Sequence, residues 1–139
     1  MKKPILAITM GDPAGIGPEI GVGALMQESV YGVCRPLIVG DAKVIAKAAE
    51  IVGAEAAVNS IGAPAEAEFR YGTIEVLDLD DVDMAELEPG RVSAMAGNAA
   101  FEAVRKAIGL AMAGEVDGTV TGPIHKEALN LAGHAFSGH

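Results

Sequence analysis

The chain has 139 residues, and its 10 Lys and Arg against 19 Asp and Glu give a formal net charge of -9. Half of the residues are hydrophobic, which predicts a buried core and excludes wholesale disorder. The acidic balance argues against nucleic acid or an anionic membrane surface as a partner, because both bind through clustered Lys and Arg. A small phosphorylated ligand is still compatible, since backbone amides hold phosphate without net positive charge.

The first predicted element is a buried strand over residues 5–10, a short apolar run closed by glycine and proline. A helix over residues 18–27 is expected next. Pro18 is tolerated in a first helical turn, and the carboxylate of Glu19 suits the positive end of the helix dipole.

Strands and helices then alternate along the rest of the chain. Further strands are predicted over residues 36–39, 56–59, 73–79 and 116–121, and helices over 42–52, 93–113 and 124–131. Asp41 is a good N-cap for the helix at 42–52. This order predicts an α/β fold with a mostly parallel sheet and flanking helices, with no domain boundary between residues 1 and 139.

The loop between the first strand and the first helix is the first candidate site. Ligands of open parallel sheets bind beyond the carboxyl ends of the strands. Four residues of this loop are predicted to face a ligand: Gly11, Asp12, Gly15 and Gly17. The loop is neither a Walker A motif nor the G-x-G-x-x-G dinucleotide fingerprint. A purely structural turn between strand and helix is the alternative.

The second candidate is the loop at residues 121–126, which also follows a strand and opens a helix. In a parallel sheet it lies at the same edge as the first loop. Lys126 is a candidate anion contact and Thr121 a candidate hydroxyl donor. The alternative is a solvated lysine at a helix start.

The titratable clusters give weaker signals. The spacing of the three histidines, His125, His134 and His139, differs from that of common zinc sites. We therefore expect only one of them to be functional, rather than all three to bind a metal together. We expect this to be His139, because it lies in the loop Ser137-Gly138-His139, where the backbone would let a ligand approach closely. The acidic turn at residues 78–83 is expected to be solvated rather than to bind a cation. The lone Cys34 cannot form an internal disulfide, which is typical of a reduced, cytoplasmic protein.

Both loops also carry a resemblance. Two runs of the sequence are similar to two signatures of the 4-hydroxythreonine-4-phosphate dehydrogenase (PdxA) family. The first run extends from Ala7 to Glu19. The second extends from Thr121 to Leu129 and is followed by Ala132-Gly133-His134 and Gly138-His139. Glu88-Pro89-Gly90 and Ala96-Gly97, between the two, also fit. Two long motifs in the right order make the match specific, and it covers the N-terminal part of a family member.

The resemblance implies an NAD-dependent oxidation of a small phosphorylated hydroxy acid, followed by decarboxylation. In that family a divalent metal such as Zn, Mg or Co polarises the reacting oxygen, and histidines shared across a homodimer hold it. The implied fold is that of the isocitrate and isopropylmalate dehydrogenases, with two α/β domains and a cleft between them.

The family motif places the substrate-contacting histidine at His139, whereas its metal histidines have no positions in this chain. The expected substrate is 4-phosphohydroxythreonine or a related 4-phospho sugar acid. The branch of the family that acts on 4-phospho sugar acids is favoured by two runs, Ile8 to Asp12 and Lys126 to Leu129. The 139 residues alone are expected to be inactive. The alternative is a truncated domain that binds a phosphorylated metabolite or a partner subunit without turnover.

Overall fold

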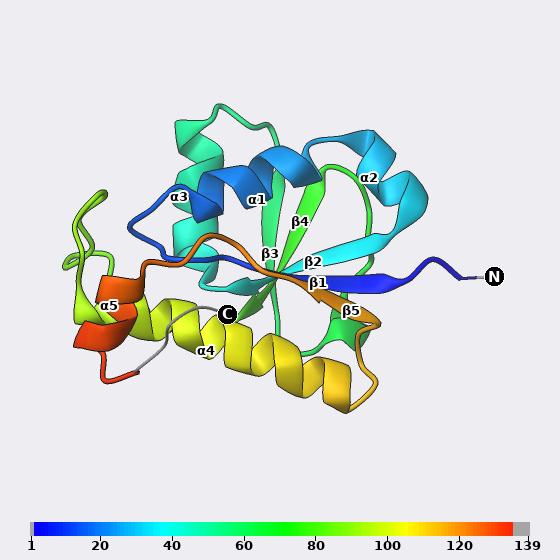
Figure 1. Ribbon diagram of the computed structural model, residues 1–139. Helices are drawn as coiled ribbons and strands as arrows, with labels where there is room; N and C mark the ends of the chain where they lie inside the picture. Colours follow the sequence, from blue (N-terminus) through cyan, green and yellow to red (C-terminus); the bar gives the residue numbers. More distant parts are fainter. Residues whose placement is uncertain (1, 135–139) are drawn as a thin grey trace.

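The computed structural model describes residues 2–134 as a five-stranded sheet with helices on both faces (Figure 1). The strands are β1 (Ile5–Thr9), β2 (Arg35–Gly40), β3 (Ala57–Ile61), β4 (Thr73–Asp78) and β5 (Gly118–Val120). The helices are α1 (Gly17–Leu25), α2 (Glu28–Val33), α3 (Ala42–Ile51), α4 (Ala94–Met112) and α5 (Lys126–Leu131), with a 3-10 turn η1 (Pro64–Glu66). The predicted α/β class is confirmed.

The strands pair in the order β3-β4-β2-β1-β5, and every pair is parallel. The central strand β2 is almost wholly buried, as the apolar run at its position predicts. The first and last strands of the described chain are neighbours, with Leu6 opposite Gly118 and Ile8 opposite Val120. Because parallel strands end at the same edge, the loops that follow β1 and β5 are brought together there.

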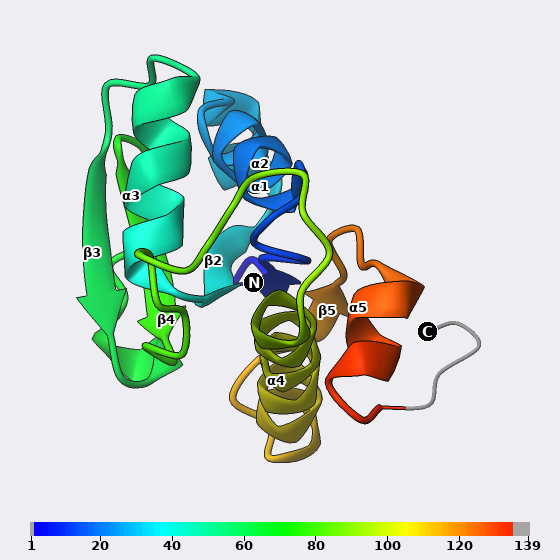
Figure 2. The same cartoon turned by 90° about the vertical axis from the view of Figure 1, so that its left-hand side faces the viewer.

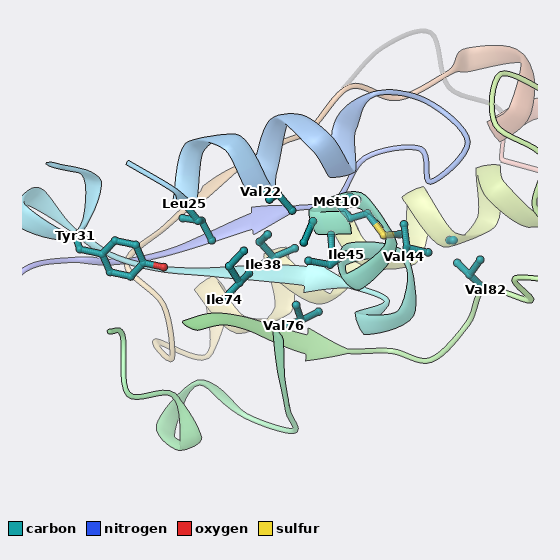
Figure 3. Packing of buried hydrophobic residues seen from close by; sticks show 13 residues of the cluster. Met10, Val22, Leu25, Tyr31, Ile38, Val44, Ile45, Ile74, Val76 and Val82 are labelled. Carbon is teal, nitrogen blue, oxygen red and sulfur yellow. The ribbon is translucent and has the colours of Figure 1, made fainter. Parts of the chain in front are cut away.

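The core lies on both faces of the sheet. On one face, helices α1, α2 and α3 pack over a cluster that Figure 3 shows from close by; it includes Met10, Val22, Leu25, Ile38, Ile45, Ile74 and Val76. On the other face, α4 packs a row of small residues against β1, β2 and β5. The cluster on this face includes Ala7, Leu37, Val39, Leu77, Ala103, Ala107 and Leu110. Figure 2 shows α4 on the side of the sheet opposite α3. The alanine row lets the long helix pack close to the strands.

Helix α2 is the one α-helix of the described chain that the sequence did not predict. It has only six residues, contains Gly32 and has no side-chain cap at Gln27, so its local signals are weak. Its buried anchor is Tyr31, whose hydroxyl pKa is raised to about 12, mainly by burial. Cys34, which ends the helix, is buried, and burial raises the pKa of its thiol.

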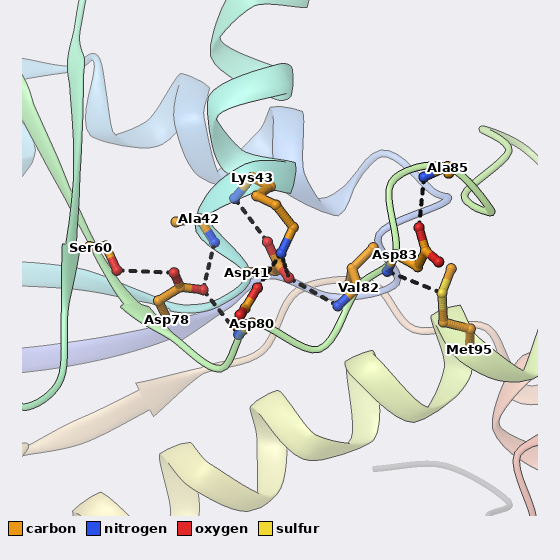
Figure 4. A network of polar contacts seen from close by, with 10 residues as sticks. All are labelled: Asp41, Ala42, Lys43, Ser60, Asp78, Asp80, Val82, Asp83, Ala85 and Met95. Atoms are coloured by element: carbon orange, nitrogen blue, oxygen red, sulfur yellow. Dashed lines mark hydrogen bonds and ion pairs between the residues drawn. The ribbon is translucent and has the colours of Figure 1, made fainter.

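Capping groups hold the carboxyl ends of β2 and β4 together (Figure 4). Asp41 is completely buried, and its carboxylate accepts from Lys43 N at 2.8 Å, which confirms the predicted N-cap of α3. It also accepts from Val82 N at 3.0 Å and pairs with the Lys43 ammonium at 3.2 Å. Lys43 makes a second ion pair with Asp80.

The acidic turn is therefore not a simple solvated surface, and the expectation is wrong in this respect. Asp78 accepts from Ala42 N at 3.1 Å, from Asp80 N at 3.0 Å and from Ser60 Oγ at 3.0 Å. Both carboxylate oxygens of Asp81 are buried without a hydrogen-bond partner. Pattern alone missed this because the turn folds back over α3 through contacts that are distant in sequence.

Burial raises the pKa of Asp81 to about 6, and the charges of Asp41, Glu102 and Asp78 add to the effect. The folded state therefore binds a proton more readily than the unfolded chain, whose carboxyl pKa is 3.8. Between these two pH values, stability falls as the pH rises, because the unfolded chain loses this proton at a lower pH than the folded protein does.

Asp81→Asn should raise the free energy of unfolding at pH 7.5 by ~1–2 kcal/mol, after allowance for partial exposure of the site, and leave it unchanged near pH 3.5. Urea unfolding at both pH values measures this. Glu86→Gln, an exposed carboxylate in the same loop, is the matched control and should not alter the pH dependence. An equal gain at both pH values would show that charge at Asp81 is not the cause.

Among residues 2–134, no helix combines the length and the apolar character that crossing a membrane requires.

Candidate functional site

The two predicted loops meet at one edge of the sheet. Asp12 N donates to Pro123 O at 2.8 Å, and Gly122 N donates to Thr9 Oγ1 at 2.9 Å. These bonds tie the loop after β1 directly to the loop after β5. The prediction that both loops face the same side of one parallel sheet is confirmed.

Glycine makes this contact possible. Gly11 has a φ of +78°, and a Cβ there would lie 2.5 Å from Pro123 O. A Cβ on Gly17 would lie 2.3 Å from Met10 O. Both residues are buried, so their first role is to let two backbones approach. Gly15, by contrast, is exposed at the tip of the loop.

Asp12 shapes the same loop. The residue is 5% exposed, and its Oδ1 accepts from Ala14 N at 2.8 Å, which closes a short turn. Gly15 N donates to Asp12 O at 3.0 Å. Helix α1 then begins at Gly17 with no side-chain cap at Ile16. The backbone N–H groups in the first turn of α1, close to the exposed Gly15, are therefore not capped by a side chain.

A third segment completes the site. Gly90 N donates to Ala14 O at 2.7 Å, which brings residues 88–92 against the first loop. The three segments enclose a hollow of about 290 Å³ lined by Asp12, Ala14, Gly15, Ile16, Gly90, Arg91, Val92, Pro123, Ile124 and His125. Sequence reasoning missed Arg91 and Val92. The available signal was the Pro89-Gly90 turn, which stands directly before them.

The other predicted residues lie differently. Thr121 and Lys126 are exposed at the second loop, and neither lines the hollow. Lys126 opens helix α5, one residue beyond His125, which does line it. His139 lies outside the described residues. Ligand contact by Thr121, Lys126, His139 and the glycine loop stays a prediction.

The two described histidines occupy separate places. His125 is exposed at the hollow, whereas the His134 ring stacks on Phe101 with the ring centres 3.7 Å apart. His134 Nε2 also lies 3.1 Å from Asn98 Oδ1. Over residues 2–134, no group of three or more His, Cys, Asp or Glu side chains is arranged to hold a metal ion. The described side chains therefore do not by themselves fit a metal centre.

An all-parallel α/β domain with a glycine-lined hollow at the carboxyl edge of its strands defines a class of metabolite-binding proteins. The model of the family described as pyridoxal phosphate biosynthetic protein PdxA matches residues 32–139. The chain belongs to the PdxA family.

Individual relatives agree with this assignment. Two curated proteins, from Symbiobacterium thermophilum and Halalkalibacterium halodurans, are both named "Putative D-threonate 4-phosphate dehydrogenase". They are 47% and 46% identical to this chain over 99% of its length. The solved structure of a 4-hydroxythreonine-4-phosphate dehydrogenase from Burkholderia phymatum matches with a TM-score of 0.96 at 42% identity, over all of this chain and 42% of that one. The chain spans about 41% of the length of both curated relatives.

Proposed function

We propose that these 139 residues form the N-terminal part of an NAD-dependent dehydrogenase that oxidises a small phosphorylated hydroxy acid and decarboxylates the product. The observation that carries the proposal is membership of the PdxA family together with the hollow where its two signature loops meet. The names of the two curated relatives favour D-threonate 4-phosphate as the substrate, over 4-phosphohydroxythreonine.

The geometry of the hollow supports a phosphorylated ligand. Exposed Gly15 and the start of α1 without a side-chain cap lie beside it, and a helix N-terminus attracts anions through its unpaired N–H groups. Its volume of about 290 Å³ is at the lower end of the range for small-molecule sites. It suits a short metabolite better than a whole dinucleotide, so NAD is proposed to bind partly outside the described residues.

The metal ion of the proposed reaction needs ligands that residues 2–134 do not supply as a group. We assign those ligands to other parts of the proposed full-length homodimer. Within this chain, the first and second loops position the substrate, and His139 is proposed to contact it. Hydride transfer requires the substrate carbon and the nicotinamide to be held in near-attack geometry, which takes both halves of the cleft.

The test compares two proteins: the 139-residue chain and the full-length enzyme that contains it. Each is assayed for NADH formation with D-threonate 4-phosphate, 4-phosphohydroxythreonine and unphosphorylated D-threonate, with and without Zn, Mg or Co. We expect metal-dependent NADH formation by the full-length enzyme on a phosphorylated acid and none by the chain alone. A full-length enzyme that oxidises none of these acids would refute the proposed function. Comparable turnover by the chain alone would show that the second half is dispensable.

A further inference from the structure

The hollow contains one permanent cation among its described lining residues, and this is Arg91. Two other lining residues carry titratable side chains. Asp12 is buried, and its Oδ1 is engaged by Ala14 N, whereas the imidazole of His125 stands at the exposed side. An anion in the hollow therefore finds its opposite charge at Arg91.

Two hydrogen bonds hold the backbone at Arg91 in place. Gly90 N is bonded to Ala14 O at 2.7 Å, and Arg91 N donates to Glu88 O at 3.0 Å. Gly90 has a φ of +80°, so the chain turns sharply just before Arg91. The turn fixes the origin of the arginine side chain against the first loop, while the side chain itself projects into solvent.

The present partner of Arg91 is exchangeable. Its guanidinium lies 3.2 Å from the carboxylate of Glu88, and the two side chains are 67% and 62% exposed. Exposed ion pairs of this kind contribute little to stability, so leaving Glu88 costs the protein little. A phosphate offers a planar guanidinium two parallel hydrogen bonds and more charge than one carboxylate.

We infer that Arg91 is a ligand-binding residue that exchanges Glu88 for a phosphoryl group bound in the hollow. The inference rests on the proposed function and deepens it. The phosphoryl group has two possible sources with the same chemistry: the phosphate of the substrate and the pyrophosphate of NAD. No covalent step is involved. When the hollow is empty, the ion pair with Glu88 keeps the guanidinium oriented.

The experiment uses the full-length enzyme that contains this chain and the variants Arg91→Gln and Arg91→Lys. Losing a charge-assisted hydrogen bond should raise one KM by ~10–100-fold, with a much smaller change in kcat. A raised KM for the phosphorylated acid assigns the substrate as the source, and a raised KM for NAD assigns the cofactor. Arg91→Lys should recover part of the loss, because it restores the charge without the planar fork.

Arg105→Gln is the matched control, because Arg105 is also exposed and paired with a glutamate three residues earlier, Glu102, at 3.8 Å on helix α4. It should change neither KM. Inorganic phosphate gives a readout independent of turnover: as a competing ligand it should inhibit the wild type several-fold more strongly than Arg91→Gln. If Arg91→Gln alters neither KM nor phosphate inhibition in an active enzyme, the role of Arg91 is refuted while the proposed function stands. An inactive wild type would instead refute both.

Discussion

Replacing Gly97 by alanine should lower the free energy of unfolding by ~2–3 kcal/mol, the usual cost of forcing extra atoms into a packed interface. Gly97 lies in α4 where helix α5 crosses it, and a Cβ there would lie 2.1 Å from Ala128 O. The obstacle is backbone, which cannot rotate aside as a side chain would. To relieve the contact, α5 must move, and His125 at its start moves with it.

Gly109→Ala is the matched control in the same helix. Nothing lies within 4 Å of a Cβ at Gly109, so the substitution should raise stability by ~0.5–1 kcal/mol through helix propensity alone. Urea unfolding of both variants measures the contrast. Two changes of the same sign and size would contradict the close contact between α4 and α5.

The second large effect is expected at Gly11, where two separate costs combine. Alanine at a φ of +78° costs ~1–2 kcal/mol, and its Cβ would also lie 2.5 Å from Pro123 O. Gly11→Ala should therefore lose ~3 kcal/mol or more and separate the two loops. Gly114 has nearly the same φ, +77°, with nothing within 4 Å of a Cβ. Gly114→Ala isolates the conformational cost and should lose only ~1–2 kcal/mol.

Thermal or urea unfolding gives the stability of both variants, and the KM of the full-length enzyme for the phosphorylated acid reports on the loops. We expect Gly11→Ala to raise this KM strongly and Gly114→Ala to leave it unchanged. Equal losses of stability at the two positions would mean that the close contact with Pro123 O adds nothing to the cost of Gly11→Ala.

Local patterns were sufficient for most of the fold. Short apolar runs bounded by glycine or proline marked the strands, and Asp41 and Ser93 marked helix starts, where their side chains accept from Lys43 N and Ala96 N. The parallel arrangement then followed from the alternation of strands and helices, and it placed both loops at one edge without any knowledge of contacts. The family resemblance is confirmed by the family match over residues 32–139 and by the curated relatives, which align over 99% of this chain.

What the sequence could not predict depends on contacts between distant segments. Arg91 lines the hollow beside Gly90, whose N–H donates to Ala14 O, and the Pro89-Gly90 turn indicates a bend there but not its partner. Asp81 stands in a run of acids that looks solvated, yet its carboxylate is buried. The close approach of backbone at Gly11 and Gly17 is of the same kind, and ligand contact by these glycines stays a prediction.

The most direct test of the account is a crystal structure of the full-length enzyme with D-threonate 4-phosphate bound. We predict the ligand at the hollow formed by residues 11–18, 88–92 and 121–126, with His139 in contact with it. A ligand bound instead at the opposite end of the sheet, for example at the hollow of about 320 Å³ beside Ile5, Arg35 and Phe69, would contradict the assignment of the site.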